Sequence, residues 1–485
     1  MSLKIALAGL AAALSLTPAA APALASARAS APVEPTPAAV DAYLREALEA
    51  TGVPGLSVVV TRGDKVVHAA GYGNDSEGRP VTAATPMRVA SVSKSFTAMA
   101  VMTLVEQGKI ALDEPVAGQL PGFRMADPRF AEITVRQLLN QTSGLSDSSL
   151  DIGDLESASS LADYTARLAK GRLAADPGSR YAYCNVNYDL AARLVETASG
   201  RPFDAYMKDR VFGPLGMTSS AVSAQAVRPA DGFVSVYGMW LPRPEASGFL
   251  DGSGSGAVIT TAADMGKWLT AQNGAGRPLV KKQSMETMHK PGPHGYGMGW
   301  SLEEESGLLV HSGNLFTYNA VEAVSPKTGY GFAVMTNGAS LYDPTYDIMR
   351  GLAAMSEGRA PAALGGDRQL YDLVLGLLAV VAAGLGVMGV LRARRWASRR
   401  SGRPWWRIAL RLAPVLLPVL VFAFYPDWVS VLLNGRYVTW EQLTYFPASL
   451  SLTLLAAALA GLLTAAVRVC VLCKLTRYAN SRRSR

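Results

Sequence analysis

The sequence has few cysteines and few histidines for its length. Its 485 residues include three cysteines and four histidines. Cys184, Cys470 and Cys473 do not make the paired, spaced set of a disulfide framework. The histidines are scattered, and neither H-E-x-x-H nor a Cys/His cluster occurs. We therefore expect no disulfide-stabilised scaffold, no metal and no other cofactor.

Two enzyme motifs are also missing. The chain contains no G-x-S-x-G, which excludes the nucleophile elbow of many serine hydrolases. Gly384-x-Gly386-x-x-Gly389 matches a dinucleotide-binding fingerprint by letter, but it lies in an apolar stretch with no strand before it. Glycines in such a stretch predict close helix packing instead.

An excess of positive charge is lacking outside the C-terminal quarter of the chain. From Arg368 onward there are 16 Lys+Arg and 3 Asp+Glu, whereas the preceding residues hold 30 basic and 35 acidic side chains. The formal net charge of +8 therefore does not describe the larger N-terminal part. A mildly acidic surface there disfavours nucleic acid as a partner.

The first 27 residues have the pattern of a secretory signal peptide. A lysine precedes an apolar stretch from Ile5 to Leu16, and alanines alternate with other residues over 23–27. The alternative is a membrane helix that the mature protein retains, which the shortness of the apolar stretch disfavours. Residues 28–37, rich in Ala, Pro and Ser, predict a flexible lead-in.

Three apolar segments occupy the C-terminal region. We predict transmembrane helices at 370–391, 408–425 and 446–467, the first of which includes the uncharged stretch from Leu373 to Leu391. Seven arginines lie in the loop 392–407, and the tail 468–485 is also basic. The positive-inside rule places this loop and tail in the cytoplasm and the body, residues 38–366, outside. We expect a multi-pass protein of the cell membrane that contacts the bilayer through three helices.

Helix-like and strand-like segments alternate in the body. A helix over 38–51 precedes strands at 56–61 and 65–70, joined by a turn at 62–64. A mostly helical middle follows, and a strand-rich stretch over 297–336 comes last. Strands at both ends of a helical insert predict an α+β unit whose sheet is completed by segments distant in sequence.

Three serines surround a single lysine in RVASVSKSFTAMAVM, residues 88–102. With about 3.6 residues per helical turn, Ser91 lies one turn from Lys94 on the same face, whereas Ser93 and Ser95 point elsewhere. Such a pair can act as nucleophile and proton acceptor if burial lowers the pKa of the lysine. The structural alternative is that Ser91 caps the helix and Lys94 is solvated.

A second group of reactive side chains lies in DPGSRYAYCNVNYDLAARLVE, residues 176–196. A Pro-Gly turn and then Tyr183-x-Asn185 precede an amphipathic helix over 188–198. A tyrosine hydroxyl between two cations favours phenolate and can relay a proton, and Asn185 can hydrogen-bond a substrate amide. The alternative is a capping asparagine beside a core tyrosine.

Three short motifs follow one another along the chain: Ser91-x-x-Lys94, Tyr183-x-Asn185 and His311-Ser312-Gly313. Together with stretches such as ITVRQLLNQTSGL at 133–145 and GYGMGW at 295–300, they resemble the serine β-lactamase and penicillin-binding-protein family. The likeness is to its class C β-lactamase, D-alanyl-D-alanine carboxypeptidase and esterase-like branch, and it covers residues 38–352. It implies a β-lactamase-like α+β fold, with an antiparallel sheet flanked by helices and an all-helical subdomain.

The resemblance also implies a role for each motif. Ser91 is then the nucleophile, Lys94 its proton partner and Tyr183 the general base. The backbone N–H groups of Ser91 and Asn314 would form the oxyanion hole. The implied substrate-binding residues are Asn185, His311, Ser312, Gly313 and Asn314.

The third motif departs from the form Lys-Thr-Gly that is frequent in the family. A literal Lys327-Thr328-Gly329 follows Ser-Pro between two strand-like runs, which indicates a hairpin turn. We predict that 327–329 is a solvated turn and that 311–313 lines the cleft. Because a histidine need not be cationic at neutral pH, a substrate carboxylate would be held less firmly, which disfavours efficient β-lactamase activity.

These observations predict a membrane-anchored extracytoplasmic serine hydrolase that forms an acyl-enzyme at Ser91. Small peptides, amides, esters or β-lactam-like molecules are the expected substrates, with D-alanyl peptides of the cell envelope as the natural candidate. An acyl transferase or peptide cyclase is an alternative, because an amine can replace water in the second step. A β-lactam-acylated sensor is another, although the short cytoplasmic segments cannot house an effector domain. An inactive scaffold is disfavoured because every reactive position is filled, and no protein partner is indicated.

Overall fold

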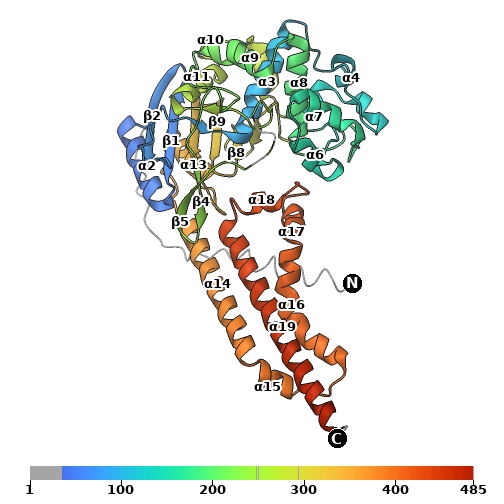
Figure 1. The fold of residues 1–485 in the computed structure, drawn as a ribbon. Helices are drawn as coiled ribbons and strands as arrows, with labels where there is room; N and C mark the ends of the chain where they lie inside the picture. The colour runs from blue at the N-terminus through green and yellow to red at the C-terminus, as the bar shows by residue number, and fades with distance from the viewer. Residues whose placement is uncertain (1–34, 247, 249–250, 293, 484–485) are drawn as a thin grey trace.

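The computed structural model describes residues 35–246, 248, 251–292 and 294–483. The predicted signal peptide, 1–27, and most of the lead-in, 28–37, lie outside these residues. Figure 1 shows a body of sheets and helices that stands at one end of a bundle of long helices. The described residues before α14 (Asp367–Leu391) form the body, and those from α14 onward form the bundle.

A six-stranded antiparallel sheet lies at the centre of the body, in the order β2-β1-β10-β9-β8-β7. Early and late parts of the chain meet where β1 pairs with β10, so that Leu56 faces Thr336. The predicted completion of the sheet by distant segments is confirmed. The strands are β1 Gly55–Arg62, β2 Lys65–Gly73, β7 Ser301–Glu303, β8 Leu308–Asn314, β9 Asn319–Val324 and β10 Tyr330–Thr336.

Helices cover both faces of this sheet, which explains why β1 is a nearly continuous apolar run. Val58 and Val60 belong to a core shared with α2 (Pro37–Thr51) and α13 (Thr345–Ser356). Val59 points the other way, into the core that contains Trp268 of α11 (Ala262–Gln272). Successive residues of a strand face opposite sides, so covering both sides requires hydrophobic residues at every position.

The helical part of the body is built around α3 (Ser93–Glu106), whose residues from Ser93 to Leu104 are all buried. Beside it lies α8 (Val186–Ser199), which ends at Gly200 in the left-handed conformation. The predicted α+β architecture with a helical subdomain is confirmed. The other body elements are α4 Val116–Gln119, α5 Val135–Leu139, α6 Ile152–Glu156, α7 Leu161–Arg167, α9 Phe203–Met207, α10 Gly213–Leu215, α12 Lys282–His289, β3 Met87–Arg88, β4 Gly232–Val236, β5 Met239–Arg243, β6 Ile259–Thr260 and β11 Gly338–Ala339.

Three helices of the C-terminal region are long and apolar enough to cross a membrane: Asp367–Leu391, Trp405–Ala423 and Ala448–Arg477. They correspond to the predicted spans 370–391, 408–425 and 446–467. The third helix continues as far as Arg483, through most of the predicted tail, and part of the arginine-rich loop is helical. The elements here are α14 Asp367–Leu391, α15 Ala393–Ser398, α16 Trp405–Ala423, α17 Tyr425–Leu432, α18 Trp440–Leu443 and α19 Ala448–Arg483.

Close packing of α14 against α19 accounts for two of the three glycines that mimic a nucleotide-binding motif. A Cβ on Gly386 would lie 2.7 Å from the Cβ of Ala460, and one on Gly389 would lie 2.5 Å from Thr464 Oγ1. The prediction of helix packing is confirmed for this pair. A Cβ on Gly384 would meet no atom within 4 Å.

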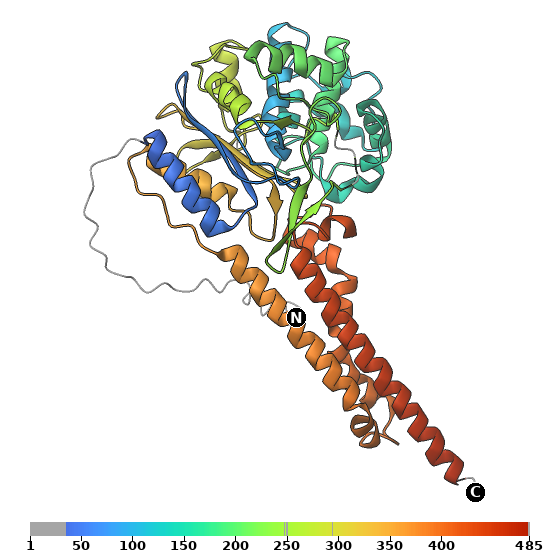
Figure 2. The same cartoon turned by 60° about the vertical axis from the view of Figure 1, so that its left-hand side comes forward.

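The β4–β5 hairpin reaches from the body down to the helix bundle (Figure 2), and a buried polar network joins the two there. Asp372 of α14 accepts hydrogen bonds from Ser235 Oγ at 2.5 Å and from Ser449 Oγ of α19 at 2.6 Å. Arg368 pairs with the same carboxylate at 3.3 Å. Buried charged groups require such partners, so the network fixes how the body stands on the helices. On the same side, α17 and α18 lie directly beneath the body (Figure 1).

Candidate active site

Ser91 lies in a 3₁₀ turn, Ala90–Val92, immediately before α3, and it lines a cavity of about 860 Å³. The turn is strained, because Ala90 has a φ of +49° although it carries a side chain. A left-handed residue of this kind costs roughly 1–2 kcal/mol and persists only where the surroundings enforce it. The hydrogen bond from Val89 N to Val258 O, 3.1 Å, anchors the entry to the turn.

Lys94 is fully buried and joins three parts of the site. Its Nζ donates to Ser91 Oγ at 3.0 Å, to Asn185 Oδ1 at 3.0 Å and to the carbonyl oxygen of Ser255 at 2.8 Å. The helical spacing therefore does bring Ser91 and Lys94 together, as expected. The alternative in which Lys94 is solvated is wrong.

The surroundings of Lys94 favour its neutral form. Burial, reinforced by the positive charge of Arg436 and opposed by the negative charge of Asp189, lowers its pKa to about 7. Asp189 is itself buried and accepts hydrogen bonds from Ser255 N at 3.1 Å and Ser255 Oγ at 3.2 Å. A lysine with a pKa near neutrality is partly unprotonated and can accept a proton.

The Tyr183 ring lies next to two cations. Lys94 Nζ is 4.8 Å from its centroid and Arg436 Cζ is 5.2 Å from it. The charge of Arg436 favours phenolate, as expected, but it does not prevail in this structure. Burial raises the pKa of Tyr183 to about 12, although hydrogen bonding to Ser91 and the charge of Arg436 oppose the rise. Loss of hydration thus outweighs the cations, and the phenol holds its proton at neutral pH.

Asn185 stands at the N-cap position of α8, but its side chain makes no capping hydrogen bond. The Oδ1 atom accepts from Lys94 instead, and the residue lines the cavity. The capping alternative is therefore wrong for this side chain. Cys184, beside it, is a buried free thiol.

His311 is buried on β8 and lines the cavity together with the exposed Ser312. Its Nε2 lies 3.0 Å from Tyr296 Oη, and its Nδ1 lies 2.8 Å from the carbonyl oxygen of Ser312. A carbonyl only accepts, so Nδ1 carries the proton and Nε2 accepts from the tyrosine. Burial, reinforced by Lys94, lowers the pKa of His311 to about 3. The imidazole is thus neutral at physiological pH, which is the state considered above for the histidine of the third motif.

Gly313 brings β8 against the Ser91 turn. A Cβ there would lie 2.1 Å from Val89 O and 2.9 Å from Ser91 N. The absence of a side chain therefore accommodates the protein's own backbone. Residues 311–313 were predicted to line the cleft, and His311 and Ser312 do line the cavity, but Gly313 does not. Asn314, the next residue, donates from Nδ2 to Asp343 Oδ2 at 2.7 Å, which holds the end of the strand. The oxyanion role of its backbone N–H stays a prediction.

Lys327-Thr328-Gly329 lies in the turn between β9 and β10, where Lys327 is exposed. Gly329 O accepts from Gly63 N at 2.9 Å, so this turn lies next to the β1–β2 turn. The residues that line the cavity do not include 327–329. The prediction of a solvated turn away from the cleft is confirmed.

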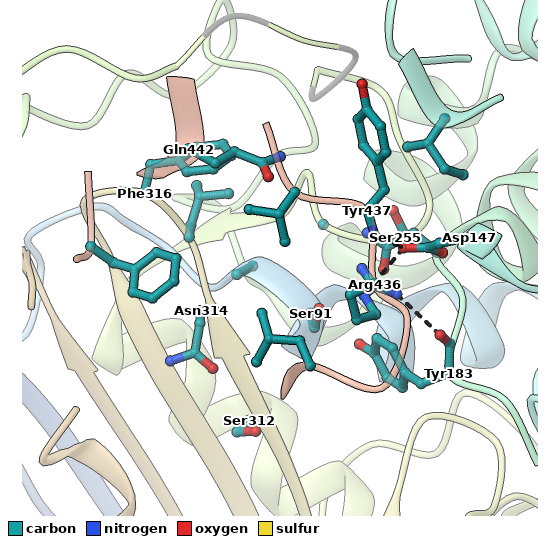
Figure 3. A pocket seen from close by; sticks show the side chains of 18 of the residues that line it. Ser91, Asp147, Tyr183, Ser255, Ser312, Asn314, Phe316, Arg436, Tyr437 and Gln442 are labelled. Carbon is teal, nitrogen blue, oxygen red and sulfur yellow. Dashed lines mark hydrogen bonds and ion pairs between the residues drawn. The ribbon is translucent and has the colours of Figure 1, made fainter. Parts of the chain in front are cut away.

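The other wall of the cavity comes from the region between the last two long helices, which we call the α17–α18 segment, residues 425–443. Figure 3 shows its Arg436 between Asp147 and Tyr183. This wall could not be predicted from the sequence, because no local motif marks it. The one signal was an arginine in a loop that the positive-inside rule keeps poor in basic residues. Residues of this region that line the cavity are Leu432, Leu433, Asn434, Arg436, Tyr437, Val438, Gln442 and, just beyond it, Phe446.

A metal site is not formed by the described residues, since no three of their His, Cys, Asp or Glu side chains come together in a suitable group. Lys94 contacts Ser91 and Asn185, and the phenol of Tyr183, the amide of Asn185 and the neutral imidazole of His311 line the same cavity as Ser91. Such a set can activate a hydroxyl nucleophile and move its proton without a metal.

Comparisons with known proteins point to one family. The family profile described as Beta-lactamase matches residues 40–354. Protein flp of Staphylococcus aureus (strain COL) is 28% identical over 323 residues, which cover 63% of this chain and 64% of that protein. Penicillin-binding protein 4 of Amycolatopsis lactamdurans is 30% identical over 334 residues, 62% of this chain and 85% of that protein. The match thus spans less than two thirds of the Staphylococcus aureus relative.

A solved structure extends the likeness to three dimensions. The octameric penicillin-binding protein homologue from Pyrococcus abyssi matches with a TM-score of 0.56 and 25% identity, covering 70% of this chain and 80% of that one. The family match runs from α2 to α13 and contains the central sheet and all three motifs. The chain therefore belongs to the β-lactamase family.

Proposed function

We propose that the protein is a membrane-anchored serine hydrolase that works through a Ser91 acyl-enzyme on peptide, amide or ester substrates. The observation that carries the proposal is the state of Lys94. Its Nζ lies 3.0 Å from Ser91 Oγ, it is fully buried, and its pKa is lowered to about 7. A neutral amine in that position can accept the serine proton as the nucleophile attacks.

Acylation then divides proton transfer between two residues. Ser91 Oγ attacks the substrate carbonyl carbon, and its proton passes to Lys94 Nζ. The negative charge on the carbonyl oxygen is held by the backbone N–H groups of Ser91 and Asn314. As the tetrahedral intermediate collapses, Tyr183 gives its proton to the departing amine or alcohol. Because the phenol is protonated in the resting site, it is better suited to this acid step than to the base role that the family resemblance implies.

Hydrolysis of the ester follows by the reverse path. Water attacks the carbonyl carbon of the acyl group on Ser91, and the phenolate of Tyr183 recovers a proton from that water. The bond from this carbon to Ser91 Oγ then breaks as Lys94 returns a proton to Ser91 Oγ. The enzyme is thereby restored and a carboxylic acid leaves. Each proton taken up in one half of the cycle is released in the other.

Small D-alanyl peptides of the cell envelope are the substrate class that we favour. The cavity of about 860 Å³ is lined by tyrosine, asparagine and serine side chains that can hydrogen-bond amide groups. The name of the relative penicillin-binding protein 4 says that it binds penicillin, which is a β-lactam and therefore a cyclic amide. With a neutral His311 in the third motif, we expect β-lactams to be turned over slowly.

The body stands outside the cell membrane in this proposal, anchored by α14, α16 and α19. The arginine-rich loop 392–407 and the basic tail 468–485 then face the cytoplasm. Protease added to intact cells should remove the body and leave 392–407 protected. Cleavage within 392–407 in sealed cells would show that the orientation is reversed.

A fluorophosphonate probe tests the enzyme proposal directly, because it labels an activated serine and not a capping one. The full chain in detergent should be labelled, the label should vanish in Ser91→Ala, and it should persist in the matched variant Ser93→Ala. Ser93 is a suitable control because it lies two residues away and accepts from Val258 N at 2.9 Å, away from Lys94. Labelling that survives in Ser91→Ala would contradict the proposal, and a single burst without turnover on D-alanyl peptides, β-lactams and esters would indicate a sensor.

A further inference from the structure

The α17–α18 segment reaches the active site through a sharp turn. Asn434 and Gly435 have φ of +56° and +83°, which is the left-handed conformation that asparagine and glycine adopt most readily. Gly435 N donates to Ser430 O at 2.8 Å, so the turn closes back onto the end of α17. The next residue, Arg436, is thereby directed up from the helix bundle into the body.

Arg436 makes three contacts there, all with residues of the body. Its Nη1 donates to the carbonyl oxygen of Tyr183 at 3.1 Å, and its Nε pairs with Asp147 Oδ2 at 3.3 Å. Its guanidinium also lies over the Tyr183 ring. Tyr437 N donates to the same Asp147 carboxylate at 3.2 Å, which fixes the backbone on the far side of the arginine. Arginine thus holds the main chain and the ring of Tyr183 together, a geometry that its planar group allows.

The backbone around Tyr183 is otherwise anchored from one side. Ala182 N and Cys184 N donate to Gln141, at 2.9 Å to its carbonyl oxygen and 3.1 Å to its Oε1. Arg436 holds the intervening carbonyl from the side of the helix bundle. Removing it leaves this carbonyl without that donor and the phenol less constrained, although α8 and the core stay intact.

Charged and titratable groups from several elements surround Lys94. Among the charged groups, Arg436 lowers the pKa of Lys94, whereas the acidic groups raise it. Because 30% of the Arg436 side chain is exposed, solvent screens its charge in part. The groups that act on Lys94 or are acted on by it are Asp189 of α8, Asp147 of the turn before α6, Cys184 and Tyr183 of the loop before α8, His311 of β8 and Arg436 of the α17–α18 segment.

We propose that Arg436 is a positioning residue of the active site, through which the α17–α18 segment holds Tyr183 in place and keeps Lys94 ready to accept a proton. The membrane-helix region therefore completes the catalytic site besides anchoring it. This inference rests on the proposed hydrolase function.

The sign of the expected pH effect follows from the charge. A neighbouring cation disfavours protonated Lys94, so removing Arg436 raises the lysine pKa and reduces the share of neutral amine at a given pH. In Arg436→Gln, the acid limb of the kcat/KM profile should move to higher pH by about half a unit to one unit, a three- to tenfold loss on that limb. The plateau should fall as well, because Tyr183 is less well placed.

The full chain in detergent, labelled with the fluorophosphonate probe or supplied with an activated ester, serves for the experiment. Arg436→Lys keeps the charge but not the planar group, so it should restore the position of the acid limb and leave the plateau low. Arg243→Ala is the matched control. Arg243 also links the body to the membrane-helix region, through Thr444 O at 2.6 Å and the Tyr445 ring at 3.5 Å, yet it does not line the cavity.

The outcomes separate the possibilities. A shifted limb in Arg436→Gln, restored in Arg436→Lys and absent in Arg243→Ala, supports the proposal. An unshifted limb with an unchanged plateau, in protein whose circular dichroism matches the wild type, overturns it. An equal shift in Arg243→Ala also overturns it, because displacement of the whole region would then be the cause. If Arg436→Gln does not fold, Arg436→Lys decides the charge effect by itself. An acid limb at the wild-type pH supports the effect, and an acid limb shifted to higher pH overturns it. A wild-type chain that is never labelled contradicts the hydrolase function itself.

Discussion

The two walls of the cavity differ in how their residues are held. On the body wall, Ser91, Lys94 and Asn185 are joined by 3.0 Å hydrogen bonds, and Lys94 is completely buried. On the wall from the α17–α18 segment, the side chains of Leu432 and Tyr437 are 72% and 41% exposed. The chemistry is thus placed on packed elements, whereas the other wall is tied down by few polar contacts.

This difference suggests a division of labour. A nucleophile and its proton acceptor must keep their geometry to within a fraction of an ångström, which requires neighbours that cannot move. A wall with few buried apolar contacts opens more readily, and it can admit substrate or adapt to it. Body-wall substitutions should therefore act on the chemical step. Substitutions on the other wall should act mainly on binding, except at Arg436, which contacts Tyr183 directly.

The largest effect is expected for Lys94→Met. Methionine fills the volume of the lysine without its amine, so Ser91 loses its proton acceptor while the core around α3 stays packed. The acylation rate should fall on the order of 10⁴-fold or more, because removing one member of a catalytic group that acts as a unit removes most of the effect of the whole group. Stopped-flow acylation with an activated ester measures this, and circular dichroism checks the fold. An active, folded Lys94→Met would refute the assignment.

Tyr183→Phe should come next, with a loss of about 10²- to 10⁴-fold, which is typical of general acid–base groups. The loss should be greater for an amide than for an ester with a good leaving group, because the good leaving group departs without a proton. Parallel kcat/KM measurements on an amide and its nitrophenyl ester show the contrast. Equal losses on both substrates would return Tyr183 to the role of base.

Gly313→Ala tests the contact between β8 and the Ser91 turn. The new Cβ would lie 2.1 Å from Val89 O, so the strand must shift and carry the Asn314 N–H away from the oxyanion position. Loss of one such donor reduces kcat by about 10²- to 10³-fold. The crowding should also lower the free energy of unfolding by about 1–3 kcal/mol, measured by urea denaturation. A fully active variant would show that the strand does not supply the donor.

A much smaller effect is expected for Tyr437→Ala on the opposite wall. The tyrosine holds Asp147 through its backbone N–H, which the substitution keeps. Loss of this partly exposed side chain should weaken substrate binding by about 1 kcal/mol or less, which corresponds to an increase in KM of about fivefold or less. The value of kcat should stay nearly unchanged. A kcat loss comparable to that of Tyr183→Phe would break the contrast between the walls.

The smallest effect should be that of Lys327→Ala, which lies on neither wall. Because Lys327 lies on an exposed turn, we expect the free energy of unfolding to change by about 0.5 kcal/mol or less and activity to be unaltered. One substrate assayed beside Gly313→Ala gives the comparison. Loss of activity in Lys327→Ala would mean that the literal Lys-Thr-Gly serves the site after all.

Features that depend on short-range geometry could be predicted from the sequence. The β1–β2 hairpin and α2 were predicted to within a few residues, because turn residues and hydrophobic periodicity act over short distances. The pairing of Ser91 with Lys94 followed from helical spacing alone. The order of the three motifs further supplied the fold, through the family resemblance.

The sequence by itself therefore determined which residues can do chemistry, where the apolar helices lie and which family the chain joins. Tertiary structure alone decided that Tyr183 keeps its proton, because desolvation depends on everything packed around the ring. It also decided that Gly313 makes room for the Val89 backbone and that Arg436, 253 residues after Tyr183, meets it in the cavity. Contacts between segments this far apart are set by how the body stands on the helix bundle, and no local pattern records that arrangement.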